Sequence, residues 1–164
     1  MNMAAMWKLP VIFIIENNHY AMGTSSKRST ANDDYHIRGQ VFGIPGVKVN
    51  GMDVLEVYSA AQKVVEHVRA GKGPYVMEME TYRYRGHSMS DPAKYRSKEE
   101  VEKYKDEKDP IEHVRKIIFK ENYASEEDLK TIENEIKEII NEAVEYAKNS
   151  PEPDANELFT DITR

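Results

Sequence analysis

The chain has 164 residues, of which 40% are apolar, a formal net charge of −6 and no cysteine. This length and composition indicate one ordinary globular domain with a real core rather than a disordered chain. Acidic and basic residues are interspersed along most of the chain, which argues against a broad surface for nucleic acid or an anionic membrane. The lack of cysteine excludes disulfides, a thiolate nucleophile and a cysteine-ligated metal.

Residues 1–8 have a helix-forming composition, and Pro10 ends that helix. The β-branched run Val11–Ile15 predicts a strand buried on both faces of a parallel sheet. Residues 16–46 show little periodicity, which indicates a functional loop with a short helix near residues 33–40. No apolar run is long enough to span a bilayer, and the first residues lack the order of a signal peptide, so we expect a soluble, intracellular chain.

The segment "IPGVKVNG" supplies a turn and a short strand, and a helix follows that Asp53 and Glu56 would begin as a capping box. The buried stripe expected for this helix consists of Val54, Val57, Ala61, Val64, Val65 and Val68. The next segment, "GPYVMEMETYRY", predicts a strand with alternating inner and outer faces. Strand, helix and strand form a right-handed crossover, so we predict an α/β fold with a mostly parallel sheet.

The last third of the sequence is helical in pattern and strongly charged. Helix starts are predicted at Ser97, which forms a capping box with Glu100, at Asp109 before a proline, and at Ser125. The longest helix carries one apolar row that must cover the sheet or meet a partner: Leu129, Ile132, Ile136, Ile139, Ile140, Ala143, Val144 and Ala147.

Two asparagines, Asn17 and Asn18, follow the first predicted strand in "ENNHY". In open α/β sheets, ligands bind beyond the carboxyl ends of the strands. Amide and carbonyl oxygens are neutral ligands that suit Mg²⁺ or Ca²⁺ when a carboxylate or phosphate supplies negative charge. The alternative is that both asparagines tie down the turn, and spacing alone favours that alternative.

The second candidate is the loop "YRYRGHSMSDPAKYR", again just past a predicted strand. Arg83, Arg85 and Arg96 are suited to an anion, and His87 to a phosphate contact or a proton transfer. The alternative is a surface loop in which the arginines pair with Asp91 and neighbouring acids. His19 is less informative, because it either lines the first site or faces away from it. Lys27 and Arg28 form a basic patch that is too small to indicate nucleic-acid binding.

Taken together, "NMAAMWKLPVIFIIENNHYAMGTSSKRS" and "KGPYVMEMETYRYRGHSMSDPAKYR" closely resemble the alpha subunits of the thiamine-diphosphate-dependent component of pyruvate dehydrogenase complexes. The resemblance covers nearly the whole chain. It implies that residues 1–96 are the C-terminal part of a thiamine-diphosphate-binding α/β domain. Residues 97–164 would be a helical C-terminal region that packs on the same domain or on a partner subunit.

The resemblance also implies roles for single residues. Asn18 would give its side-chain oxygen, and Tyr20 its backbone carbonyl, to the Mg²⁺ that bridges the protein to the diphosphate. His87 would be the catalytic residue beside the diphosphate, and Arg83 would stabilise its loop. Ser25 and Ser88 match positions that kinases modify in mitochondrial relatives, where phosphate on Ser88 would disturb the loop.

The implied reaction is decarboxylation of pyruvate on thiamine diphosphate, followed by acetylation of a lipoyl group on a partner acyltransferase. Relatives act as two alpha and two beta subunits, in the cytoplasm of bacteria or the mitochondrial matrix of eukaryotes.

The family signature begins with Gly-Asp-Gly, which this sequence lacks, so we expect a C-terminal half that is inactive alone. The alternatives are a non-catalytic remnant that acts as an interaction module, and a branched-chain oxoacid or acetoin dehydrogenase alpha subunit.

Overall fold

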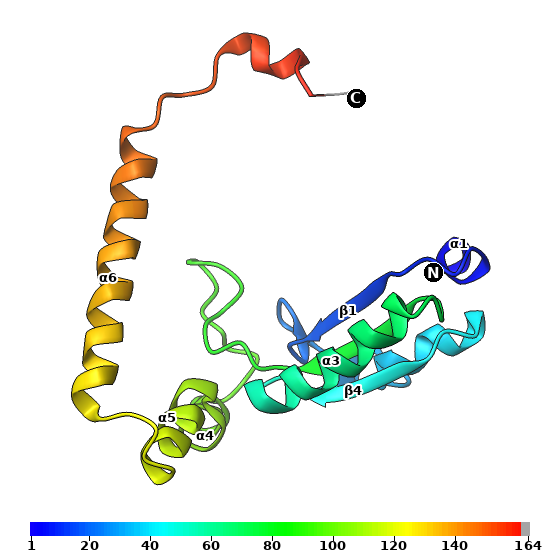
Figure 1. Cartoon of the computed structure of the whole chain (residues 1–164), viewed down its shortest axis with the longest axis horizontal. Coiled ribbons are helices and arrows are strands. Elements are labelled where there is room, and N and C mark those ends of the chain that lie inside the picture. Colours follow the sequence, from blue (N-terminus) through cyan, green and yellow to red (C-terminus); the bar gives the residue numbers. More distant parts are fainter. Residues whose placement is uncertain (162–164) are drawn as a thin grey trace. The chain divides into compact units, whose positions relative to one another are not determined.

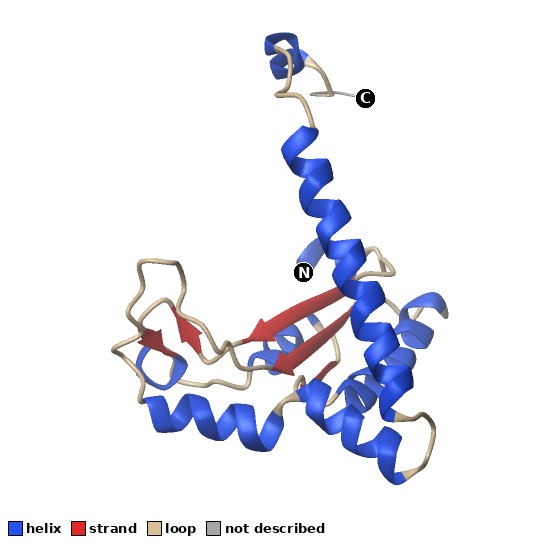
Figure 2. Cartoon of the chain, turned by 90° about the vertical axis from the view of Figure 1, so that its left-hand side faces the viewer, coloured by secondary structure: helices blue, strands red, loops and turns tan. Residues whose placement is uncertain are grey.

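Figures 1 and 2 show the computed structural model, which describes residues 1–161. The chain divides into two compact units, one from Met1 to Ile117 and a second that starts at Ile118. The first contains a parallel sheet with helices and the second is helical, which confirms the α/β class with a helical C-terminal region.

Three parallel strands form the main sheet of the first unit. They are β1 (Ile12–Asn17), β4 (Gly46–Asn50) and β5 (Tyr75–Glu80), in the spatial order β1-β5-β4. Helix α3 (Val54–Arg69) joins β4 to β5, which confirms the predicted strand–helix–strand unit (Figure 1). Asn17 of β1 and Asn50 of β4 both lie opposite Glu80. All three strands therefore end at the same edge of the sheet, where their following loops begin.

The core lies between α3 and the sheet, where Val64 packs with Val49 and Met77. The predicted alternation along β5 is wrong, because Val76, Met77 and Glu78 are buried in succession. The reason is that β5 is the central strand, with α3 and the 3₁₀ helix η1 (Tyr35–Phe42) both in contact with it. The prediction that β1 is buried on both faces is also wrong, because β1 is an edge strand of this sheet and Ile14 is 60% exposed.

The start of α3 differs in detail from the predicted capping box. Asp53 accepts hydrogen bonds from the backbone N–H groups of Leu55 and Glu56, as an N-cap does. The Glu56 carboxylate instead accepts from the Asn50 N–H, at 3.1 Å, because the Asp53 N–H is taken by the Asn50 carbonyl. Val54 is 49% exposed and not part of the buried stripe, since it belongs to the first turn, ahead of the residues that pack on the sheet.

The remaining elements up to α5 follow the predicted order, with two additions. The helices are α1 (Asn2–Met6), α2 (Ser26–Ser29), α4 (Lys98–Lys108) and α5 (Pro110–Lys120), and the last three residues of α5 belong to the second unit. The additions, which the sequence did not predict, are α2 and a small hairpin of β2 (Tyr20–Ala21) and β3 (Thr24–Ser25). Ser97 caps α4 through the Glu100 N–H, but the Glu100 side chain points elsewhere, so the predicted capping box there is only half formed.

The second unit contains α6 (Glu126–Asn149) and the 3₁₀ helix η2 (Ala155–Phe159). Ser125 and Asp128 form a complete capping box at the start of α6. The predicted apolar row is exposed apart from the half-buried Leu129, with Ile136 at 53% and Ile139 at 57%. In residues 1–161 no helix combines the length and the apolar character needed to cross a bilayer.

Candidate functional site

The turn after β1 is built around the side chain of Asn17, which is only 7% exposed. Its Oδ1 accepts a hydrogen bond from the His19 N–H at 3.0 Å, and its Nδ2 donates to Glu78 Oε1 at 2.8 Å. His19 takes the left-handed backbone conformation, with φ of 62°. Such a conformation is uncommon for a residue with a side chain. Asn17 therefore ties down the turn, as the turn-forming alternative predicts.

Asn18 is placed differently from its neighbour. Its Oδ1 accepts a hydrogen bond from the Thr81 hydroxyl at 2.9 Å, and its Nδ2 lies 3.4 Å from Glu16 Oε1. A carbonyl-type oxygen has two lone pairs, so the Asn18 oxygen keeps one for another ligand. Thr81 follows β5 directly, which means that the two neighbouring strand ends jointly orient this amide.

The backbone carbonyl of Tyr20 also points away from its own hairpin. In an antiparallel ladder, pairs that exchange hydrogen bonds alternate with pairs that do not. The Ser26 N–H donates to the His19 carbonyl at 2.8 Å, so His19 and Ser26 are a hydrogen-bonded pair. The next pair, Tyr20 and Ser25, is therefore one that does not exchange hydrogen bonds. The ladder therefore leaves the Tyr20 carbonyl free to accept from, or bind to, another group.

A small hollow of about 40 Å³ brings the two predicted loops together. Asn18 and Tyr20 line it from the loop after β1, and Arg83 and His87 line it from the loop after β5. The rest of the lining consists of Met22, Arg85, Tyr95 and Arg96. All four residues that the resemblance selects thus lie around one hollow. Their roles there stay predictions.

The loop that carries His87 is held by two arginines and one aspartate. Arg83 Nη2 donates to the His87 carbonyl at 3.2 Å, and Arg96 donates to the carbonyls of Arg83 and Tyr84. The alternative of arginines paired with Asp91 is not what the loop shows. Asp91 instead accepts from the N–H groups of His87 and Ala93 and from the Tyr95 hydroxyl.

These three hydrogen bonds lower the pKa of Asp91, with the His87 N–H as the largest cause. Because the pKa in the folded chain lies below the ordinary value of 3.8, the carboxylate stabilises the loop fully above pH 3.8 and loses this effect as the pH falls through the lower folded value. We expect the amide proton resonance of His87 to titrate with a midpoint below 3.8, measurable by NMR. In Asp91→Asn this titration should vanish. A wild-type midpoint above 3.8 would contradict the conclusion that the hydrogen bonds of the loop lower the pKa of Asp91.

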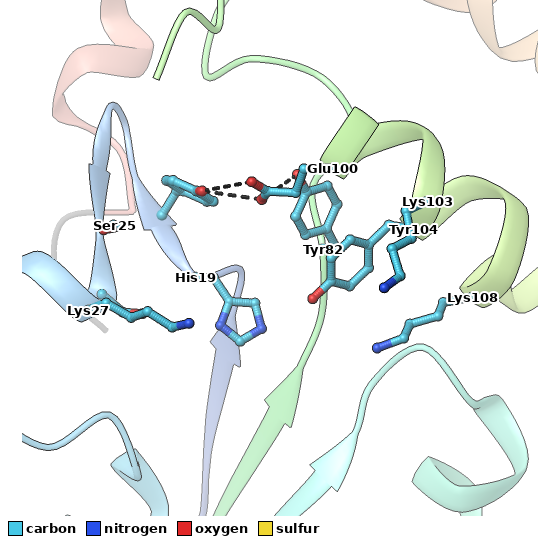
Figure 3. Close-up of a pocket in the computed structure, with 10 residues that line it drawn as sticks. His19, Ser25, Lys27, Tyr82, Glu100, Lys103, Tyr104 and Lys108 are labelled. Carbon is cyan, nitrogen blue, oxygen red and sulfur yellow. Dashed lines mark hydrogen bonds between the residues drawn. The ribbon is translucent and has the colours of Figure 1, made fainter. Parts of the chain in front are cut away.

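A larger cavity of about 470 Å³ lies beside the hairpin, with the side chains of His19, Lys27 and Lys108 directed toward it (Figure 3). Glu100 of α4 accepts hydrogen bonds from the hydroxyls of Tyr20 and Tyr82, the second at 2.9 Å. Burial, followed by the bond to Glu100, raises the pKa of Tyr82 to about 12. His19 lines this cavity and a neighbouring one, and Glu100 anchors α4 to Tyr20, a residue that also lines the small hollow.

Sequence reasoning missed three residues that organise the site: Glu78, Thr81 and Glu100. Glu78 is fully buried and bonded to Asn17, Thr81 orients Asn18, and Glu100 holds Tyr20. A signal for Glu78 was present, because it is a charged residue inside an apolar run that is typical of a strand. Thr81 and Glu100 have no such signal, since their partners are 63 and 80 residues away in the sequence.

The oxygens at the hollow suit a hard cation only in part. Asn18 Oδ1 and the Tyr20 carbonyl are neutral ligands of the kind that Mg²⁺ accepts. Within residues 1–161, no group of three or more histidine, aspartate or glutamate side chains is arranged to hold a metal ion. A cation at this place therefore needs anionic oxygens from a ligand or from another segment of protein.

The parallel sheet, with its loops at one edge, defines the chain as an α/β protein, a class in which ligands bind beyond the carboxyl ends of the strands. The match to the Dehydrogenase E1 component family, over residues 1–156, shows that the chain belongs to that family.

Proteins similar to this chain include several named as alpha subunits of the pyruvate dehydrogenase E1 component. The relative from Rhizobium meliloti is 57% identical over 161 residues, which cover 98% of this chain and 46% of the relative. The relative from Rickettsia bellii is 59% identical, with 98% and 49% covered. A testis-specific mitochondrial form from Rattus norvegicus is 49% identical, with 96% and 40% covered. The chain thus spans about half the length of these relatives.

Proposed function

We propose that the chain is part of a pyruvate dehydrogenase alpha subunit, which decarboxylates pyruvate with thiamine diphosphate and passes the acetyl group to a lipoyl group. The observation that carries this proposal is the hollow at which Asn18, Tyr20, Arg83 and His87 meet. It lies at the sheet edge where α/β proteins bind their ligands, in a chain that is 57% identical to a pyruvate dehydrogenase alpha subunit.

In this proposal Asn18 and Tyr20 hold Mg²⁺ through their two neutral oxygens. The diphosphate and a carboxylate from another segment supply the remaining, negatively charged ligands, which agrees with the lack of an acidic cluster among the described residues. When bound, thiamine diphosphate supplies the electron sink for the decarboxylation. The protein residues orient it and its metal ion.

The loop after β5 contributes position and positive charge. His87 is exposed, and its backbone is fixed on both sides, by Arg83 at its carbonyl and by Asp91 at its N–H. Its imidazole is therefore available to donate to a phosphate oxygen or to move a proton. Arg83 and Arg85 also line the hollow, and their positive charge favours an anionic ligand.

The proposed partners are the rest of an alpha subunit, a beta subunit in an assembly of two alpha and two beta chains, and a lipoyl-bearing acyltransferase. The exposed apolar row of α6 supports a packing partner for that helix. The proposed compartment is the cytoplasm in a bacterium and the mitochondrial matrix in a eukaryote.

Reconstitution tests this function. The chain is combined with the remaining segment of a related alpha subunit and with a beta subunit, and the Mg²⁺-dependent release of CO₂ from pyruvate is measured. We expect turnover from the mixture and none from the chain alone, since residues 1–161 show no acidic cluster that could complete the metal site. Preference for a branched-chain oxoacid or acetoin would change the substrate assignment. A stable assembly that never binds thiamine diphosphate would favour the interaction module.

A further inference from the structure

Glu78 is a buried carboxylate at the centre of the sheet. It lies in the middle strand β5 and is 0% exposed. Its Oε1 accepts from Asn17 Nδ2 at 2.8 Å. Its Oε2 accepts from the His36 N–H at 2.8 Å and lies 3.2 Å from His36 Nδ1. Both oxygens are therefore used as acceptors, by residues of β1 and η1.

A buried carboxylate is costly unless every oxygen finds a donor, and an apolar side chain would fill this central position at a lower cost. The groups that donate to Glu78 indicate what this carboxylate does. Asn17 Nδ2 is fixed by Glu78, which leaves Asn17 Oδ1 to face the other way, toward the His19 N–H. Glu78 thus determines which end of the Asn17 amide forms the turn.

We propose that Glu78 is the positioning residue of the strand-end site: through Asn17 it fixes the left-handed turn at His19, and so the places of Asn18 Oδ1 and the Tyr20 carbonyl. Asn18 precedes His19 and Tyr20 follows it, so both oxygens depend on this backbone turn. The part of this inference that concerns Mg²⁺ rests on the proposed function, whereas the part that concerns the turn does not.

The substitution Glu78→Gln tests the hydrogen-bond logic with little change in size. The glutamine has one acceptor and one donor end, so its amide N–H must face either Asn17 Nδ2 or the His36 N–H. In either case two hydrogen-bond donors face each other. Rotation of the Asn17 amide removes this conflict at position 78, but Asn17 Nδ2 then faces the His19 N–H, which is also a donor. We expect protection of the His19 amide against hydrogen exchange to fall about tenfold or more in the full chain.

The double variant Asn17→Asp with Glu78→Gln restores every bond. The new amide N–H at position 78 donates to one oxygen of the new carboxylate at position 17, whose other oxygen accepts from the His19 N–H. The new amide oxygen at position 78 accepts from the His36 N–H. Asn17→Asp alone puts two carboxylates at the 2.8 Å contact and should loosen the turn as well. We therefore expect both single variants to lose His19 protection and the double variant to regain it, which a general packing defect would not do.

Glu80→Gln is the matched control. Glu80 lies on the same strand, but its side chain is 38% exposed and pairs with Lys48 at 3.1 Å. We expect His19 protection in this variant to stay within about twofold of the wild type. Unchanged protection in Glu78→Gln, or no recovery in the double variant, would overturn the positioning role.

The reconstituted assembly then separates this inference from the proposed function. If the wild type binds Mg²⁺ and thiamine diphosphate, Glu78→Gln should weaken that binding by about 10–100-fold, as the loss of a supporting residue does. Equal binding by the wild type and Glu78→Gln would overturn the link from Glu78 to the metal ligands. A wild type that binds neither, together with the expected exchange results, would support the positioning of the turn and overturn the proposed function.

Discussion

Replacing Asn18 with alanine will weaken the Mg²⁺-dependent binding of thiamine diphosphate to the reconstituted assembly by more than about 100-fold. Loss of a residue that only supports a metal ligand costs about 10–100-fold, and Asn18 is itself a proposed ligand. The alanine also leaves the Thr81 hydroxyl without its acceptor at this strand end. Titration calorimetry with thiamine diphosphate, with and without Mg²⁺, measures the effect.

Two variants serve as controls for Asn18. Asn18→Asp keeps an oxygen at the same place and should retain Mg²⁺-dependent binding, because a carboxylate is at least as good a ligand as an amide. Thr81→Val removes the hydroxyl that orients the amide, so we expect an intermediate loss. Wild-type affinity in Asn18→Ala, with an unchanged melting temperature, would show that the side chain is not a ligand.

Replacing Arg96 with alanine will release the loop that carries His87. The guanidinium donates to the carbonyls of Arg83 and Tyr84, and it lies 5.2 Å from the ring centre of Tyr82. Hydrogen bonds to charged groups contribute about 1.5–3 kcal/mol each, and partial exposure reduces this, so the local stability of the loop should fall by about 1–3 kcal/mol. Faster amide exchange over residues 83–91, with the exchange of β5 unchanged, is the expected observation.

Arg96→Lys is the matched variant for this position. A lysine keeps the positive charge but lacks the planar fork that reaches two carbonyls at once, so we expect most of the loosening to persist. If Arg96→Lys restores the wild-type exchange rates, charge rather than the fork holds the loop. Exchange rates that stay at the wild-type level in Arg96→Ala would contradict the assigned role of Arg96.

The strand–helix–strand unit was predictable from local patterns. The β-branched runs and Asp53 as an N-cap are signals within a few residues of the elements that they define. The same holds for the helix starts at Ser97 and Ser125. Local patterns could not tell how deeply each strand is buried, because that depends on its place in the sheet. Val76 and Glu78 are both buried only because β5 is central.

The sequence selected residues that lie together in the structure, but it did not predict their hydrogen bonds. The family resemblance selected Asn18, Tyr20, Arg83 and His87, and the structure places them around one hollow. The partners that orient them are distant in the sequence, such as Glu78, which is 61 residues from Asn17. The direction of each amide and carbonyl is decided by these distant partners.

The proposed function depends above all on Asn18 Oδ1 and the Tyr20 carbonyl as ligands of the metal ion in a thiamine-diphosphate enzyme. A crystal structure of the reconstituted assembly with Mg²⁺ and thiamine diphosphate would show these two contacts or their absence. We predict Mg²⁺ at about 2.0–2.1 Å from both oxygens, with its remaining ligands from the diphosphate and from a carboxylate of another segment. A bound cofactor whose metal ion contacts neither oxygen would contradict the proposed role of both residues.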